Sequence, residues 1–226
     1  MIQNHKLNFT FIHNPKCGGT TVREALKRIS DEEDFFWMFE TKTLPFGGSL
    51  VIDKAHIPID YLRFYYPESY KFLISNFSFC FVRHPIHRLI SAYLEFDQNF
   101  NGVSKKNNSF QRLRNFKAYI DRRLVAPSID HKTIHCLPQH RFFLAKNKKI
   151  PVILRIEKWI EDLDKIADYN IYLADLLKNC LEEKKKNSSG NIHEFMWLWK
   201  ELTLERKILV TNYYEDDFKI LNYPIP

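Results

Sequence analysis

The sequence predicts an α/β fold in three layers, with a central, mainly parallel β-sheet flanked by helices and a helical C-terminal part. Short apolar runs alternate along the chain with longer segments whose apolar residues recur at helical spacing. The run Phe77–Val82 is apolar over almost its whole length, which is typical of a strand covered on both faces of a parallel sheet. Near the start of the chain, a strand-like run passes through a glycine-containing loop into a helical segment, which is the unit from which such folds are built.

Four strands and the helices around them are predicted in chain order. The strands are expected at 9–14, 49–52, 77–82 and 152–156. Helices are expected at 22–29, just after His56, at 86–96, at 110–124 with Ser109 as a cap, at 139–145 and at 159–180, with one or two more between 193 and 221.

Length and composition indicate a single domain over residues 1–226, with a flexible basic linker near 182–191. The chain has 34 Lys and Arg residues against 27 Asp and Glu, a net charge of +7 that suits an anionic ligand but does not identify one. No apolar run approaches about 18 residues and no signal pattern is present, so we expect a cytoplasmic protein without an integral membrane segment. No metal site is predicted, because the four cysteines lack metal-ligand or disulfide spacing: Cys17, Cys80, Cys136 and Cys180.

The loop Pro15–Thr21 has the residues of a phosphate-binding turn. Glycines let backbone N–H groups approach an anion, and the first turn of the following helix offers unpaired N–H groups at its positive end. The motif is P-loop-like but differs from the pattern G-x-x-x-x-G-K-[ST], because Lys16 precedes the glycines and is followed by Cys17 instead of a hydroxyl residue. A tight turn with an exposed lysine is the alternative interpretation.

A second motif runs from Val82 to Tyr93. Arg83 follows the apolar strand, and Ser91 lies eight residues later on the next helix. Right-handed crossovers place the loop after the first strand and the loop after Val82 at one edge of the sheet, so Lys16 and Arg83 are expected to face a common crevice. A surface ion pair and a hydroxyl on a helix face are the alternative roles of Arg83 and Ser91.

The two motifs together resemble those of the PAPS-dependent sulfotransferases, in the carbohydrate (heparan/chondroitin-type, "sulfotransferase family 2") branch. The resemblance implies that the first motif holds the 5′-phosphosulfate of PAPS (3′-phosphoadenosine 5′-phosphosulfate) and that Arg83 and Ser91 hold the 3′-phosphate. His56, within Ala55–Pro58, is similar to the family segment that carries a catalytic histidine, and Glu157 and 213–223 resemble later landmarks. The implied 5′ contacts are Lys16, Cys17, Gly18, Gly19, Thr20 and Thr21.

The resemblance implies sulfuryl transfer to an acceptor hydroxyl by in-line displacement, in which positioning and charge stabilisation do most of the catalysis. His56 is the candidate base, and Lys16 would stabilise charge on the leaving phosphate. The branch suggests a glycan acceptor, or another small hydroxylated metabolite. The nine histidines leave the choice of base open: His13 and His84 flank the two motifs, with a structural role as the alternative, and His135 and His140 are candidates for an acceptor loop.

Two other functions compete with this interpretation. A nucleotide kinase or NTPase would use the same glycine loop, but the position of Lys16 and the missing magnesium hydroxyl count against it. A basic nucleic-acid-binding protein would show a clustered basic stripe with exposed aromatic residues, whereas the basic residues here are dispersed. We therefore expect PAPS and a hydroxylated acceptor as partners, and no nucleic acid.

Overall fold

The computed structural model describes residues 1–43, 47–100, 108–125, 133–145, 148–149, 151–185 and 192–226. The chain divides into two compact units. The first unit comprises Met1–Arg83 and Gln139–Ser188, and the second comprises His84–Pro138 and Ser189–Pro226. The single domain over 1–226 therefore stays a prediction.

The first unit contains a four-stranded sheet with the strand order β1-β2-β5-β8. β2 (Phe9–Ile12), β5 (Phe77–Val82) and β8 (Val152–Arg155) are parallel neighbours, and β1 (Ile2–Asn4) pairs antiparallel with β2. The central, mostly parallel sheet predicted from the sequence is confirmed. Because β2 and β5 are adjacent and parallel, the loops that follow them emerge at the same edge of the sheet.

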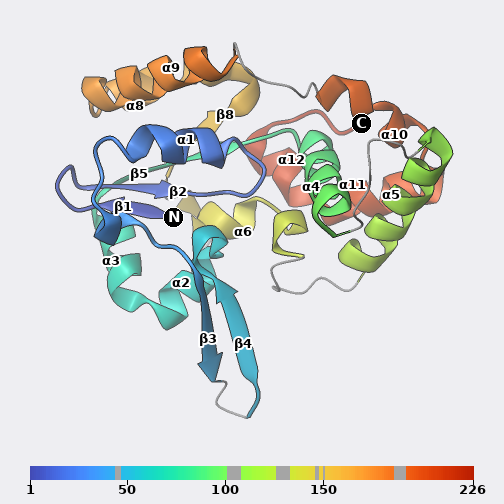
Figure 1. Ribbon diagram of the computed structural model, residues 1–226, viewed down its shortest axis with the longest axis horizontal. Helices are drawn as coiled ribbons and strands as arrows, with labels where there is room; N and C mark the ends of the chain where they lie inside the picture. Colours follow the sequence, from blue (N-terminus) through green and yellow to red (C-terminus); the bar gives the residue numbers. More distant parts are fainter. Residues whose placement is uncertain (44–46, 101–107, 126–132, 146–147, 150, 186–191) are drawn as a thin grey trace. The chain divides into compact units, whose positions relative to one another are not determined.

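Helices cover both faces of this sheet (Figure 1). α1 (Gly19–Leu26) and α9 (Ile171–Lys185) lie on one face, and α2 (Ile59–Tyr65) and α3 (Pro67–Ser75) lie on the other. Alternate strand residues point to the first face, as the two-residue period of a strand requires. They form a core with α1 and α9 that includes the buried rings of Phe9, Phe11, Phe79 and Phe81.

The predicted strand at 49–52 forms, but it does not join the central sheet. β4 (Ser49–Asp53) pairs antiparallel with β3 (Phe39–Thr43) in a hairpin that projects from the first unit (Figure 1). Most residues of the hairpin are exposed or half-buried, so it lacks the two covered faces that a central strand has. A 3₁₀ turn, η2 (Lys54–His56), follows β4 directly and leads into α2.

The helix predicted at 159–180 is broken into α7 (Trp159–Asp162), α8 (Asp164–Ala167) and α9. The Asp162 carboxylate accepts a hydrogen bond from the backbone N–H of Arg155 at 2.7 Å, and Asn170 Oδ1 accepts one from the N–H of Leu173 at 3.0 Å. The Asn170 side chain caps the start of α9 in this way, whereas the Asp162 side chain, at the end of α7, bonds back to the end of β8. The remaining short elements here are η1 (Glu32–Asp34), α6 (His140–Phe143), β6 (Leu144–Ala145), β7 (Lys148–Lys149) and η4 (Ile156–Lys158).

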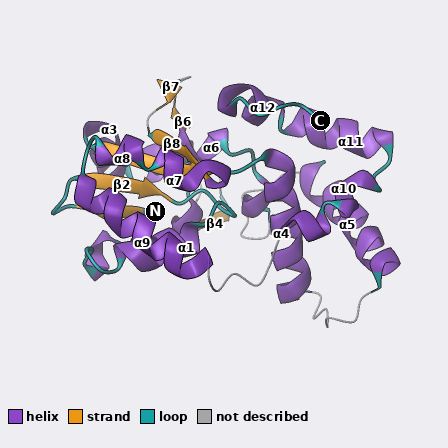
Figure 2. Ribbon diagram, turned by 90° about the horizontal axis from the view of Figure 1, so that it is seen from above, coloured by secondary structure: helices purple, strands orange, loops and turns teal. Residues whose placement is uncertain are grey.

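The described part of the second unit contains helices and loops (Figure 2). Its longest helices, α4 (Pro85–Phe100) and α5 (Ser109–Leu124), share a core with the C-terminal helices. Asn108, and not the predicted Ser109, caps α5, because its Oδ1 accepts the N–H of Gln111 at 2.9 Å. The other elements are η3 (Ile134–Cys136), η5 (Ile192–Phe195), α10 (Trp197–Lys200), α11 (Leu204–Tyr213) and α12 (Glu215–Leu221).

The predicted linker near 182–191 begins inside a helix, since α9 continues to Lys185, and 186–191 lie outside the described residues. Among the described helices, none combines the length and the apolarity that crossing a membrane demands.

Candidate functional site

The loop between β2 and α1 has the backbone geometry of an anion cradle. Lys16 lies in the left-handed region with φ 64°, and Gly18, the N-cap of α1, has φ 78°. No described side chain caps this end of α1, and its first turn contains no acidic residue. The N–H groups of the first helical turn are therefore donors of the kind that a phosphate or sulfate group binds, and the roles of Lys16, Thr20 and Thr21 beside them stay predictions.

Both glycines of the loop are required by their surroundings. At Gly18 a side chain would be strained by the positive φ, and its Cβ would lie 2.8 Å from Cζ3 of Trp159. At Gly19 a Cβ would lie 1.8 Å from Nε2 of His13, so the imidazole ring leaves no room for a side chain at this position. His13 thus packs directly against the first residue of α1.

Cys17 turns its thiol inward. The side chain is buried, and Sγ donates towards the carbonyl of Pro15 and towards Oε1 of Gln139, each at 3.4 Å. The thiol is thus occupied within the protein, and the role of Cys17 as a 5′ contact stays a prediction.

Arg83 leaves the carboxyl end of β5 beside the loop. Its Nη1 donates to the carbonyl oxygen of Lys16 at 3.5 Å. The Arg83 side chain and the Lys16 backbone are therefore adjacent within the first unit, as the parallel pairing of β2 with β5 requires, and the crevice that the two residues are expected to share stays a prediction.

Gln139 joins these segments, and sequence reasoning missed it. Its side-chain amide is completely buried, with 0% of its surface exposed. Oε1 accepts from the Arg83 N–H at 2.9 Å and from Asn14 Nδ2 at 3.2 Å, and Nε2 donates to the Arg83 carbonyl at 2.7 Å. A lone glutamine before a short helix carries no sequence signal that would have revealed this.

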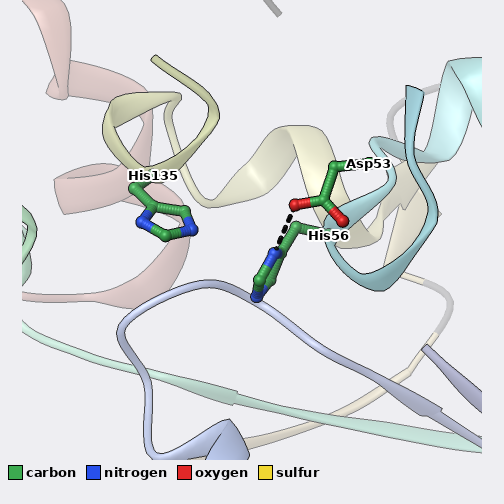
Figure 3. Close-up of side chains that lie close together, drawn as sticks. All are labelled: Asp53, His56 and His135. Carbon is green, nitrogen blue, oxygen red and sulfur yellow. Dashed lines mark hydrogen bonds and ion pairs between the residues drawn. The ribbon is translucent and has the colours of Figure 1, made fainter. Parts of the chain in front are cut away.

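His56 lies at the end of η2 and is oriented by a carboxylate. Its Nδ1 is 2.8 Å from Oδ2 of Asp53, which is itself the N-cap of η2 and accepts the N–H of Ala55 through Oδ1 at 3.0 Å (Figure 3). The His56 side chain is 15% exposed, so it is accessible while being held. With Nδ1–H donated to Asp53, Nε2 carries the lone pair that a general base needs.

His13 connects His56 to the loop. The rings of His13 and His56 have centroids 4.4 Å apart, and the ring of Trp37 stacks on His13 at 6.5 Å with an interplanar angle of 16°. Since His13 also contacts Gly19, the predicted base and the predicted anion loop are separated by one side chain. The guanidinium of Arg23 lies 4.6 Å from the centre of the Trp37 ring.

A cavity of about 690 Å³ adjoins this group in the first unit. It lies beside α1 and the segment that leads to β3, and Trp37 is common to the cavity and to the stack on His13. Its lining mixes aromatic, cationic and hydrogen-bonding groups: Arg23, Lys27, Ser30, Glu32, Phe35, Trp37 and Met38.

The hairpin is anchored to the His56 segment through Glu40. The Glu40 carboxylate accepts the Tyr66 hydroxyl at 2.7 Å and pairs with Lys42 and, at 3.6 Å, with Lys54. The hydrogen bond from Lys42 and then that from Tyr66 hold the pKa of Glu40 below its ordinary value. Burial, and next the Glu40 hydrogen bond, raise the pKa of Tyr66 well above its usual range.

The predicted contact Ser91 belongs to the second unit. It lies in the second turn of α4 and is half-buried, between the buried residues Ile90 and Ala92. His135, which is also drawn in Figure 3, belongs to that unit too, where its Nδ1 lies 2.8 Å from Oε2 of Glu95. His84 accepts the N–H of Ile86 through Nδ1 at 3.3 Å.

A family model described as the sulfotransferase family matches residues 1–224 of the 226-residue chain. The match includes the β2–α1 loop, Arg83, Ser91 and His56. No curated protein and no solved structure matches the chain.

Proposed function

The chain belongs to the sulfotransferase family, whose activity is sulfuryl transfer, and we propose that it moves the sulfuryl group of PAPS to a hydroxyl of a carbohydrate acceptor. The observation that carries the proposal is the adjacency of the β2–α1 loop and Arg83 at one edge of the sheet. A nucleotide with phosphates on both its 3′ and 5′ positions needs a second cationic contact besides the glycine loop, and Arg83 would supply it. The family match does not favour the kinase or nucleic-acid alternatives.

The donor set fits PAPS in number and in charge. Lys16, the first-turn N–H groups of α1 and the two threonines would hold the 5′-phosphosulfate, together with the backbone of Cys17, Gly18 and Gly19. The absence of a Cβ at Gly18 and Gly19 lets an anion approach the backbone. Arg83 and Ser91 would hold the 3′-phosphate, for which an arginine fork is well suited. PAPS, when bound, supplies an activated sulfuryl group with PAP as the leaving group.

His56 is proposed as the base. The acceptor hydroxyl must lose its proton as the new S–O bond forms, and Nε2 of His56 would take it. Asp53 holds the ring and its tautomer through Nδ1 and stabilises the imidazolium that results. Lys16 would stabilise the negative charge that develops on the bridging oxygen.

The cavity beside Trp37 supports a carbohydrate acceptor. Trp37 lines the cavity and stacks on His13, whose ring lies beside that of His56. Its volume of about 690 Å³ is within the range of ligand pockets, and aromatic faces with nearby hydrogen-bonding groups suit the mixed apolar and hydroxyl surface of a sugar.

The test is a transfer assay with ³⁵S-labelled PAPS and a panel of oligosaccharides and small hydroxylated metabolites. We expect labelled product from the wild-type protein and a loss of about 100-fold or more in His56→Ala. His5→Ala is the matched control, because His5 is an exposed histidine whose ring lies 4.4 Å from that of Phe72 and is tilted by 54° to it. Near-normal transfer by folded His56→Ala would sink the assignment of the base, and absence of PAPS turnover with every acceptor would sink the proposed function.

A further inference from the structure

Gln139 connects the two segments that the proposed function assigns to the two ends of the nucleotide. We propose that Gln139 is a positioning residue that sets the separation of the β2–α1 loop and Arg83, and that this separation makes the site select a 3′,5′-bisphosphorylated nucleotide over nucleotides with one phosphate. The inference rests on the proposed function, because it concerns the nucleotide site of that function.

The primary amide is the chemical group that this position requires. Arg83 is the first residue beyond β5, where the ladder of strand hydrogen bonds to β8 has ended at Val82. Gln139 gives Arg83 the two bonds that a neighbouring strand would give, since Oε1 accepts its N–H at 2.9 Å and Nε2 donates to its carbonyl at 2.7 Å. An aliphatic side chain can do neither, whereas the neutral amide satisfies both groups in a fully buried position without taking up a proton.

The same amide oxygen also holds the loop. Asn14, two residues before Lys16, donates to Oε1 at 3.2 Å, and Cys17, directly after Lys16, donates to it at 3.4 Å. Asn14 in addition donates to the Phe81 carbonyl of β5 at 3.2 Å. Lys16 is thus flanked on both sides by residues that are bonded to Gln139.

Lys16 needs this support because of its backbone. A residue with a side chain at φ 64° is disfavoured, and such a conformation persists only where its surroundings determine it. Hydrogen bonds on both sides hold Lys16 in this conformation. Asn14 and Cys17 bond to Gln139, and Arg83 Nη1 donates to the Lys16 carbonyl at 3.5 Å. Loss of Gln139 would release the loop and Arg83 from one another.

Separation matters because the ribose fixes the distance between the 3′ and 5′ groups of the nucleotide. When both protein segments are held at that distance, binding at one end makes binding at the other intramolecular, and PAP gains affinity over AMP. When the segments move independently, each can still contact one phosphate, but the second contact adds less binding free energy. Loss of Gln139 is therefore expected to reduce the ratio of the affinity for PAP to the affinity for AMP, in addition to any general loss of affinity.

The experiment measures, by titration calorimetry, the dissociation constants of PAP, 5′-AMP and 3′-AMP for the wild type, Gln139→Leu and Gln139→Met. Gln3→Leu is the matched control, because Gln3 is also buried and its Nε2 donates to the Ser69 carbonyl at 2.7 Å, in β1 and away from the loop. We expect the preference for PAP over either monophosphate to fall by about tenfold to a hundredfold in both Gln139 variants, the range set by loss of one charge-assisted hydrogen bond, and to hold in Gln3→Leu.

Gln139→Met keeps the length and the unbranched shape of the side chain but neither donates nor accepts as the amide does, so it carries the test if Gln139→Leu does not fold. An unchanged preference in a folded Gln139 variant, an equal fall in Gln3→Leu, or failure of both Gln139 variants to fold would each overturn the inference. A wild-type protein that shows no preference for PAP would overturn the proposed function itself, which is a different result from a wild-type preference that survives the loss of Gln139.

Discussion

A side chain at Gly19 should be excluded by His13, and Gly19→Ala tests this directly. A Cβ at Gly19 would lie 1.8 Å from Nε2 and 2.0 Å from Cδ2 of His13, whereas ordinary contact begins at 3.4 Å. The imidazole must therefore move by at least 1.6 Å, the difference between 3.4 Å and 1.8 Å. It cannot do so without disturbing its neighbours, because His13 is only 9% exposed and its ring lies 4.4 Å from that of His56.

The expected cost of Gly19→Ala is about 2 kcal/mol in the free energy of unfolding, within the usual range for overpacking a buried site. For a chain of this length that loss lowers the melting temperature by roughly 4–8 °C. The backbone of Gly19 is helical, so conformational strain does not contribute, and alanine would even be preferred there if the ring were absent. The predicted cost therefore comes from His13 alone.

A double-mutant cycle isolates that origin. Urea denaturation followed by circular dichroism is compared for Gly19→Ala, His13→Ala and the double variant. In the His13→Ala background, Gly19→Ala should be neutral or slightly stabilising, which gives a coupling energy of about 2 kcal/mol. Gly48→Ala is the control for backbone strain without a clash, since Gly48 has φ 86° and nothing within 4 Å of its Cβ position. An equal cost of Gly19→Ala in both backgrounds would refute the reasoning.

Three further predictions concern single charges. Lys16→Ala should abolish turnover of PAPS and weaken PAP binding, because the ammonium is the only side-chain cation in the loop; an unchanged kcat would contradict its assigned role. Asp53→Asn should lower kcat by about tenfold or more while KM for PAPS holds, since the residue acts through His56; a rise in KM alone would show that it shapes the nucleotide site instead. The pKa of Glu40 is lowered in the folded protein, chiefly by Lys42, so its contribution to stability is present above the ordinary glutamate pKa and is lost as pH falls through the folded value. Denaturation between about pH 3 and pH 6 should show a slope that Glu40→Gln reduces, and identical slopes for the two proteins would count against this ionic contribution.

Local patterns were sufficient to predict the central sheet. The apolar run of β5 has two covered faces, and the glycine loop after β2 leads into α1 as its sequence indicates. Local patterns do not predict the hairpin, because β4 has the sequence of a strand whether it pairs with β3 or with the central sheet. Partner choice depends on what covers each face of a strand, and that is a property of the whole chain.

Local sequence patterns likewise predict some residues of the candidate site and not others. The sequence identifies three candidates, Lys16, Arg83 and His56, because each lies next to a strand or turn that local patterns predict. The amide of Gln139 reaches Arg83 across 56 positions, and no local periodicity encodes that contact. The sequence does not predict the contact of His13 with Gly19, since this contact exists only once the loop has turned back over β2.

The inward thiol of Cys17 has a practical consequence for measuring motion in this loop. Cys17 is 1% exposed, so a thiol reagent can react with it only during moments when the loop detaches from Gln139. The rate of modification then reports the frequency of local opening at the nucleotide site. A nucleotide that engages both sides of the site should slow this reaction, which makes the cysteine a native probe of loop closure.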